Sequence, residues 1–162
     1  MRMADNTSLG KAVNVRPYLA LIVGILIWTG CAAGVPEISI EELDAKLSPI
    51  IVGSGSVFMK IKNVGNGEDA LLRARINIDN TIVELHENQD GKMAKTDRIL
   101  IPSKSIVLLR PASYHIMIYR MPKTVQEGDQ FALTLLFEKT GVVSIPLKFT
   151  SDATNRRKNR YR

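Results

Sequence analysis

The run Tyr114-His-Ile-Met-Ile-Tyr119 alternates apolar side chains with an imidazole and a thioether. Side chains two apart in a β-strand lie on the same face. Tyr114 and the two isoleucines therefore form one face, while His115 and Met117 share the other. The pattern predicts a strand with its apolar face in the core and with one nitrogen and one sulfur donor on the opposite face.

Comparable runs recur between 47 and 150, separated by turn residues such as Gly, Asn and Asp. Seven short runs at this spacing predict an all-β sandwich or barrel. No stretch has the period of an amphipathic helix of ten residues or more. Pro146 predicts an edge position or a bulge in the last run, because proline lacks the N–H of a sheet ladder. The runs are 56–62, 71–78, 81–86, 105–109, 115–119, 131–138 and 142–149.

The segment 84–117 contains the only two histidines of the chain, His86 and His115, together with Met93 and Met117. Thioether sulfur is soft and suits Cu(I), imidazole also suits copper, and hard cations such as Mg²⁺ prefer oxygen ligands. Two imidazoles and two thioethers form an uncharged donor set, which does not strongly favour Cu(II) over Cu(I). The residue types therefore indicate a site for a soft metal ion.

The four donors can meet only if the runs 81–86 and 115–119 are neighbouring strands. The ends of these strands would then present their donors at one point, with Met93 supplied by the loop after His86. Taken singly, such residues are more often a surface histidine or a methionine that fills the core, as we expect for Met59. Met121 is kept as a weak additional candidate for a thioether ligand. The hypothesis therefore depends on the four residues together.

The spacing of these residues resembles the PCu(A)C family of periplasmic copper chaperones. Twenty-one residues separate Met93 from His115, and the element His115-Ile-Met117 follows. The resemblance covers about 47–149, essentially the whole predicted fold. Only six residues separate His86 from Met93, fewer than is usual in the family. Other similar segments are Glu84-Leu-His-Glu87, Ile101-Pro102, Leu109-Arg-Pro111, Glu127-Gly-Asp129 and 57–63.

The resemblance implies a cupredoxin-like β-sandwich or Greek-key barrel of about seven to nine strands. It also implies a Cu(I) site made of His86, Met93, His115 and Met117. Members of the family are associated with delivering copper to the CuA centre of cytochrome c oxidase. The implied partner is therefore a copper-accepting membrane protein such as an oxidase subunit.

Residues 1–30 have the features of an export signal. The apolar run 19–28 follows Arg16 and is shorter than the roughly 20 residues of a spanning helix. Thr29-Gly-Cys31 then resembles a lipoprotein cleavage site, at which Cys31 would be acylated. An uncleaved anchor over about 18–33 is the alternative. Either reading places the chain at the periplasmic or extracellular face of the cell membrane.

Cys31 is the only cysteine, so the fold has no internal disulfide, and a lipidated Cys31 excludes thiol–disulfide chemistry. We expect a tether and a first edge strand over 31–46, followed by the copper-binding domain over 47–150. Ser39-Ile-Glu-Glu42 could instead be the capping box of a short helix. The alternation of Ile38 with Ile40 and the resemblance favour the strand.

The net charge of +6 belongs to the two ends of the chain. Residues 31–151 contain 14 basic and 14 acidic residues. A neutral domain argues against nucleic-acid binding, which needs a basic patch on the fold. The basic tail 151–162 has no apolar periodicity and is predicted to be disordered. Attraction of this tail to anionic lipid head groups is an alternative to a simple solvated tail.

We therefore expect a membrane-tethered Cu(I) chaperone that is not an enzyme. The sequence has no Gly-rich phosphate loop, no Cys-x-x-Cys and no His-Glu-x-x-His motif. One alternative is a metal-free β-sandwich lipoprotein that acts in adhesion or assembly. Another is a Zn(II) or Cu(II) storage protein using both histidines and a carboxylate such as Glu87. Glu84 and Glu87 are both expected to be solvated charges, although Glu87 could also orient an imidazole.

Overall fold

A computed structural model describes residues 34–150, which form an all-β domain without helices. Within this range no helix could cross a membrane. The expected signal segment 1–30, the lipidation site Cys31 and the basic tail 151–162 lie outside the described residues.

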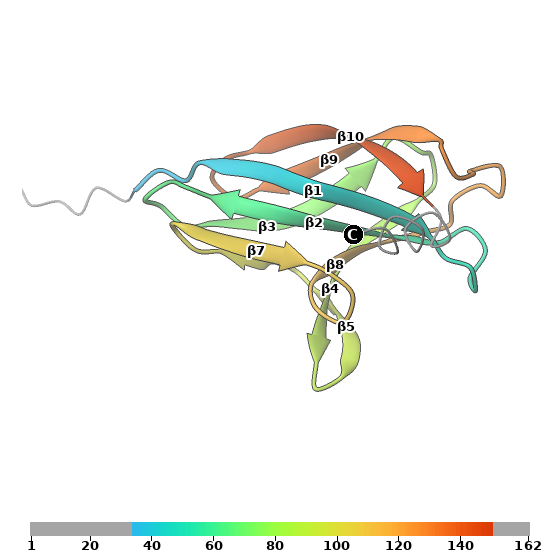
Figure 1. Cartoon of the computed structure of the whole chain (residues 1–162), viewed down its shortest axis with the longest axis horizontal. Coiled ribbons are helices and arrows are strands. Elements are labelled where there is room, and N and C mark those ends of the chain that lie inside the picture. Colours follow the sequence, from blue (N-terminus) through green and yellow to red (C-terminus); the bar gives the residue numbers. More distant parts are fainter. Residues whose placement is uncertain (1–33, 151–162) are drawn as a thin grey trace, which may run out of the picture. The chain divides into compact units, whose positions relative to one another are not determined.

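The domain has ten strands (Figure 1). Two of them, β5 and β6, do not correspond to any run predicted from the sequence, so the count exceeds the expected seven to nine. The strands are β1 (Ile38–Leu47), β2 (Gly55–Asn63), β3 (Asp69–Ile76), β4 (Ile82–Gln89), β5 (Lys92–Thr96), β6 (Ile99–Ile101), β7 (Ser105–Leu109), β8 (His115–Tyr119), β9 (Gln130–Phe137) and β10 (Val142–Thr150).

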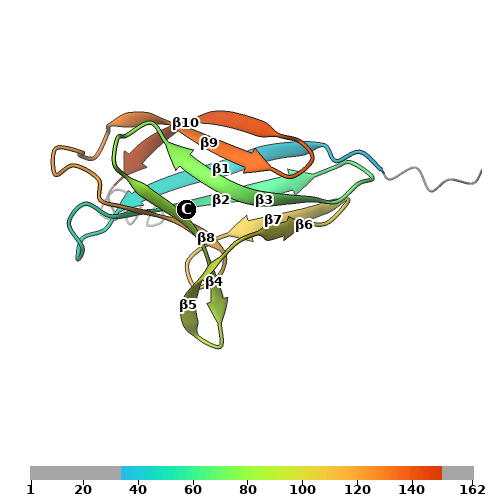
Figure 2. The same cartoon turned by 180° about the vertical axis from the view of Figure 1, so that it is seen from behind.

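The strands form two layers that are joined along one side. The order in the first layer is β5-β4-β8-β2-β1, and β7 pairs with β2 next to β8. The second layer has the order β10-β9-β3-β6, and the parallel pairing of β1 with β10 joins the two. The hairpin of β4 and β5 projects from this body in both views (Figures 1 and 2). The predicted cupredoxin-like sandwich or barrel is confirmed.

Alternating apolar residues of the two layers form the core. In β2 every second side chain is buried, including Val57, Met59 and Ile61. Phe137 and Phe149 of the opposite layer are among the largest fully buried side chains. Burying an apolar side chain of this size stabilises the fold by about 1.5–3 kcal/mol. The expectation that Met59 is a core residue is confirmed, and Met121, the weak ligand candidate, is buried as well.

The first strand is confirmed as a strand, and its predicted edge position holds for residues 38–44 but not for Ala45 and Lys46. β1 pairs with β2 over most of its length, whereas its pairing with β10 involves only Ala45 and Lys46, so it lies between two neighbours only near its end. A register shift between Glu41 and Asp44 bends it, with Glu42 at a φ of 51°. β1 ends at Leu47, one residue beyond the segment 31–46 in which a first strand was expected.

Pro146 lies where β10 has only one paired neighbour. β10 pairs with β9 from Val142 to Lys148, whereas its pairing with β1 involves only Phe149 and Thr150. Proline can occupy such a position because no second strand needs its N–H. The predicted edge position of Pro146 is therefore confirmed.

Candidate metal centre

The two histidines lie directly opposite each other on neighbouring antiparallel strands. β4 pairs with β8 so that His86 faces His115 and Glu84 faces Met117. The centroids of the two imidazole rings are 5.5 Å apart, with their planes at 52°. The structure thus confirms that the two predicted strands are neighbours, although the histidines are far apart in the sequence.

The buried side chains of β4 and β8 show which face of these strands carries the nitrogen and sulfur donors. Leu85 of β4 and Ile116 and Ile118 of β8 are buried between the layers. Because side chains alternate along a strand, the residues between them must point to the outer face. His86, His115 and Met117 therefore share the outer face of the first layer.

Met117 lies between β4 and β2 on this face. Its register partners are Glu84 on one side and Ser56 on the other. The hydroxyl Oγ of Ser56 donates a hydrogen bond to the thioether Sδ of Met117 at 3.1 Å. A thioether sulfur is a weak hydrogen-bond acceptor with two lone pairs. The bond from Ser56 therefore fixes the position of Met117 and leaves one lone pair for a metal ion.

Met93 occupies a different place from the one predicted. It belongs to β5, the second strand of the projecting hairpin, and not to a loop after His86. The hairpin turns at Asp90 and Gly91, both of which have positive φ. Met93 pairs with Asn88 and is 45% exposed, whereas the residue opposite His86 is Lys95. Met93 shares the outer face, but it lies two strands away from β8.

Each imidazole has one nitrogen engaged by an oxygen acceptor. Nδ1 of His115 is 2.9 Å from the backbone carbonyl oxygen of Ser113. Nε2 of His86 is 3.3 Å from Oε2 of Glu84. The other carboxylate oxygen of Glu84, Oε1, is 3.2 Å from Nζ of Lys95. The hydrogen bond from His86, followed by that from Lys95, lowers the pKa of Glu84 below its usual value.

The carboxylate beside His86 is thus Glu84, and not Glu87, the alternative partner suggested by the sequence. Glu87 alternates to the opposite face of β4, where its Oε1 accepts a hydrogen bond from Nε2 of Gln89 at 2.8 Å. The sequence did contain the signal for Glu84. A residue two positions before His86 on a strand must lie on the same face.

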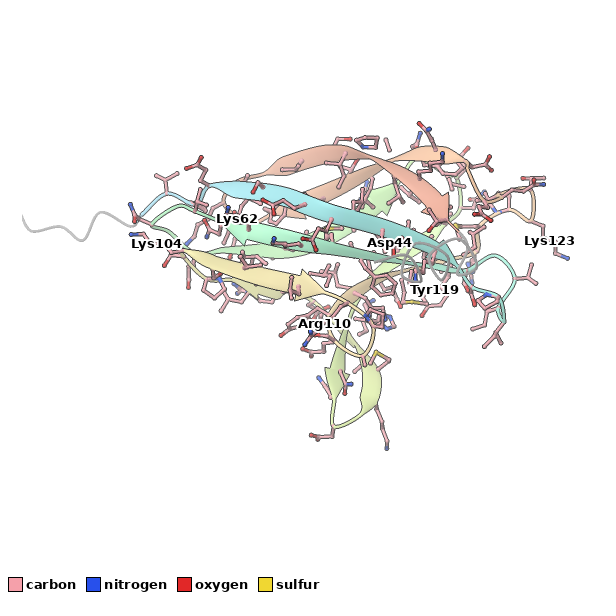
Figure 3. The ribbon with its side chains drawn as sticks, viewed as in Figure 1. Asp44, Lys62, Lys104, Arg110, Tyr119 and Lys123 are labelled. Carbon is pink, nitrogen blue, oxygen red and sulfur yellow. The ribbon has the colours of Figure 1, made fainter. Side chains whose placement is uncertain are left out.

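Two aromatic rings border the imidazoles. The ring of Phe58 lies 6.2 Å from that of His115, and the ring of Tyr119 lies 6.3 Å from that of His86. Burial and, second, the negative charge of Glu84 raise the pKa of Tyr119, so its phenol stays neutral at neutral pH. Tyr119 and Arg110 lie near the base of the projecting hairpin in Figure 3. His115 is only 7% exposed.

Asn88 ties the hairpin to the loop before β8. Its Nδ2 donates to the carbonyl oxygen of Ala112 at 3.0 Å, and its Oδ1 accepts from the backbone N–H of Gly91 at 2.7 Å. These bonds link the turn of the hairpin to the loop that carries Ser113. The relative placement of His86 and His115 is therefore supported from outside the strand ladder as well.

Among residues 34–150, no group of three His, Cys, Asp or Glu side chains is placed to hold a metal ion. The donors gathered on this face are two imidazoles and the thioether of Met117, with the thioether of Met93 farther along the hairpin.

Comparison with known proteins shows the family. The model of the family described as "Putative lipoprotein LpqE-like" matches residues 38–149. The chain belongs to this LpqE-like family. A curated protein from Leifsonia xyli subsp. xyli, named "Putative lipoprotein Lxx21020", is 26% identical over 161 residues, covering 93% of this chain and 96% of that protein.

Solved structures share the fold of this LpqE-like chain. The copper-bound PCuAC domain from PmoF2 has a TM-score of 0.60 at 24% identity, covering 72% of this chain and 95% of that domain. The Cu(I) form of DR1885 from Deinococcus radiodurans has a TM-score of 0.61 at 14% identity, covering 89% and 97%. The fold that the resemblance to the PCu(A)C family implied is therefore confirmed.

Proposed function

We propose that this protein binds Cu(I) on the outer face of β4 and β8 and passes it to a membrane protein. The observation that carries the proposal is the meeting of the two histidines, whose ring centroids are 5.5 Å apart. Met117 lies on the same face of β8, two positions from His115. Met93 on the projecting hairpin is the fourth proposed donor.

The chemistry of these donors supports Cu(I) over other ions. Thioether and imidazole groups match the softness of Cu(I), and neither needs to lose a proton when the imidazole is neutral. The carboxylate of Glu84 is engaged by His86 and Lys95. The proposed set of two nitrogens and two sulfurs is therefore uncharged, which suits a monovalent ion.

The placement of the donors suits transfer as well as binding. They lie on the outer face of the first layer rather than inside the sandwich, and the hairpin that carries His86 and Met93 projects from the body (Figures 1 and 2). Met93 is 45% exposed and His115 7%, so an acceptor would meet Met93 first. An acceptor that approaches this face could replace the donors one at a time. Copper would then move by ligand exchange without being released into solution.

We propose that the site works outside the cytoplasm, next to a membrane. The family and the Leifsonia protein both carry the description "Putative lipoprotein", and the signal-like segment of this chain ends at Cys31. Two structures with the same fold, the PCuAC domain from PmoF2 and DR1885, are described as copper-bound and as a Cu(I) form, respectively. A respiratory oxidase subunit with a CuA-type centre is the proposed acceptor, and the protein itself is not an enzyme.

An anaerobic Cu(I) titration against a chelator tests this proposal. We expect one tightly bound Cu(I) per chain and a weakening of at least about tenfold in Met117→Leu, which removes one soft donor. Met59→Leu is the matched control, because it removes a thioether from the core at nearly constant volume. Equal affinity of the Met117 and Met59 variants would exclude Met117 as a ligand.

The same titration addresses the alternatives. A metal-free adhesion or assembly module would take no Cu(I) from the competing chelator. A storage protein for Zn(II) or Cu(II) would prefer these ions to Cu(I) in direct competition. Either result would overturn the chaperone proposal.

A further inference from the structure

The two imidazoles are held in different ways, which has a consequence for how they can bind a metal ion. In a neutral imidazole one ring nitrogen carries a hydrogen and the other carries a lone pair. A metal ion needs the lone pair. The hydrogen-bond partner of each ring therefore decides which nitrogen is available.

For His115 the partner is a backbone carbonyl. Nδ1 lies 2.9 Å from the oxygen of Ser113, and a carbonyl oxygen can only accept. Nδ1 must therefore carry the hydrogen, which leaves the lone pair on Nε2.

For His86 the partner is a carboxylate, and it touches the other nitrogen. Nε2 lies 3.3 Å from Oε2 of Glu84. An ionised carboxylate can only accept, so Nε2 carries the hydrogen and the lone pair is on Nδ1. The sequence spacing explains the contact, because Glu84 is two residues before His86 on the same face of β4.

Lys95 fixes the carboxylate. Its Nζ is 3.2 Å from Oε1 of Glu84, and it lies opposite His86 in the ladder of β4 and β5. One oxygen of Glu84 thus contacts the lysine and the other contacts the imidazole. The three residues form a short chain, Lys95–Glu84–His86, that runs along the outer face.

We propose that Cu(I) binds to unlike nitrogens of the two rings, Nδ1 of His86 and Nε2 of His115, with Glu84 as a positioning residue that sets the first of them. This inference rests on the proposed Cu(I) site. Metal-bound histidines usually donate their second N–H to a carboxylate or a backbone carbonyl. Here each ring has one such partner before any metal arrives, so neither needs to exchange its hydrogen on binding.

Two-bond ¹H–¹⁵N correlation spectra of the full-length protein with ¹⁵N-labelled histidine test the assignment directly. Without metal we expect the Nε2–H form of His86 and the Nδ1–H form of His115. One equivalent of Cu(I) should shift Nδ1 of His86 and Nε2 of His115. Since the chain has only these two histidines, single His86→Gln and His115→Gln variants assign the signals.

The outcomes separate this inference from the proposed function. Copper bound through Nε2 of His86 would require the contact with Glu84 to break, and would overturn the inference while leaving the Cu(I) site intact. Spectra in which neither histidine responds to Cu(I) would overturn the proposed function itself.

Variants of Glu84 test the positioning role. We expect Glu84→Ala to weaken Cu(I) binding by about 10–100-fold, the usual cost of losing such a partner. Glu84→Gln keeps an oxygen acceptor and should restore most of the affinity. Glu87→Ala is the matched control, because Glu87 lies on the same strand but on the opposite face.

Thermal unfolding of the Glu84 variants shows whether a loss of affinity reflects a loss of fold. Weaker binding by Glu84→Ala at an unchanged melting temperature, together with recovery in Glu84→Gln, supports the inference. Unchanged affinity in Glu84→Ala, or equal losses in the Glu84 and Glu87 variants, would contradict it.

Discussion

Asp69 and His115 are both buried polar side chains, with 1% and 7% of their surface exposed, but the domain treats them differently. The carboxylate of Asp69 accepts hydrogen bonds from the backbone N–H groups of Ala70, Lys139 and Thr140 and from the hydroxyl of Thr140. For His115, the contact of Nδ1 with Ser113 occupies only one ring nitrogen. A buried side chain whose polar atoms are all hydrogen-bonded within the domain stabilises the fold. A buried side chain that keeps one ring nitrogen for another partner can bind a ligand.

Asn63 belongs with Asp69 in this comparison. Its Oδ1 accepts from the backbone N–H of Glu37 and Gly65, and its Nδ2 donates to the carbonyl oxygens of Gly67 and Pro102. Like Asp69, it links segments that are distant in the sequence and leaves none of its polar atoms unused. Substitutions at Asp69 and on the outer face of β4 and β8, made one at a time, test whether the first affects stability and the second affects copper binding.

The largest expected effect is on stability, in Asp69→Ala. The substitution leaves the buried N–H of Ala70 and the partly buried N–H groups of Lys139 and Thr140 without their acceptor, and we expect the free energy of unfolding to fall by about 3 kcal/mol. Urea denaturation measures this change. Asp79→Ala, at an exposed position, is the control and should change it by less than about 0.5 kcal/mol. Copper affinity of folded Asp69→Ala should equal that of the wild type.

His115→Ala should show the reverse pattern. Because it removes a proposed ligand and not merely a supporting partner, we expect Cu(I) affinity to fall by more than about 100-fold. The free energy of unfolding should change by only about 1 kcal/mol, within the usual range for single substitutions. Chelator competition and urea denaturation on the same sample give both values. A large loss of stability with unchanged copper affinity would show that His115 supports the fold and does not bind copper.

The pH dependence of stability should come from Asp69 and its hydrogen-bond partners. Burial alone would raise the pKa of Asp69, but its hydrogen bonds from Thr140, Lys139 and Ala70 outweigh burial and hold the pKa below its ordinary value of 3.8. A lowered native pKa means that Asp69 contributes stability above about pH 4. This contribution is lost as the pH falls through the native pKa.

Asp69→Asn tests this pH dependence. It removes the titrating group, so its free energy of unfolding should fall less steeply than that of the wild type below about pH 4. Denaturation at a series of pH values gives both slopes. Parallel curves for the two proteins would show that Asp69 does not provide the linkage.

The smallest effect is expected for Met93→Leu. Met93 is half exposed and pairs with Asn88 rather than with His86. We expect a loss of Cu(I) affinity of about tenfold or less, smaller than that of Met117→Leu, because the hairpin must adjust before Met93 can reach the copper. The two variants can be compared in one chelator competition. A larger loss for Met93 than for Met117 would show that the hairpin closes strongly over the metal.

The alternation in the sequence was enough to predict the faces of the strands. The pattern of Tyr114 to Tyr119 correctly placed His115 and Met117 opposite the core, and the run ending at His86 was correctly recognised as a strand. β5 was missed because its sequence, Lys-Met-Ala-Lys-Thr, lacks a buried face on the projecting hairpin. Without an apolar face there is no period to detect.

Pairing between distant strands was harder to predict. The alternation and the resemblance placed the first strand at an edge, and no local pattern indicated that Ala45 and Lys46 pair with β10, about a hundred residues away. For the same reason no local pattern linked Ser56 and Phe58 to the proposed site. Glu84 differs from these cases, since strict use of the two-residue period would have chosen it over Glu87.

The most direct test of the account is the copper K-edge X-ray absorption spectrum of the protein loaded with one equivalent of Cu(I) in a Cys31→Ser background. This substitution removes the only thiol, so any sulfur neighbour must be a methionine. We predict imidazole nitrogens and thioether sulfur bound to the same copper, with the imidazole contribution reduced in His86→Ala and in His115→Ala. A spectrum without sulfur, or one that neither histidine variant changes, would contradict the proposed site.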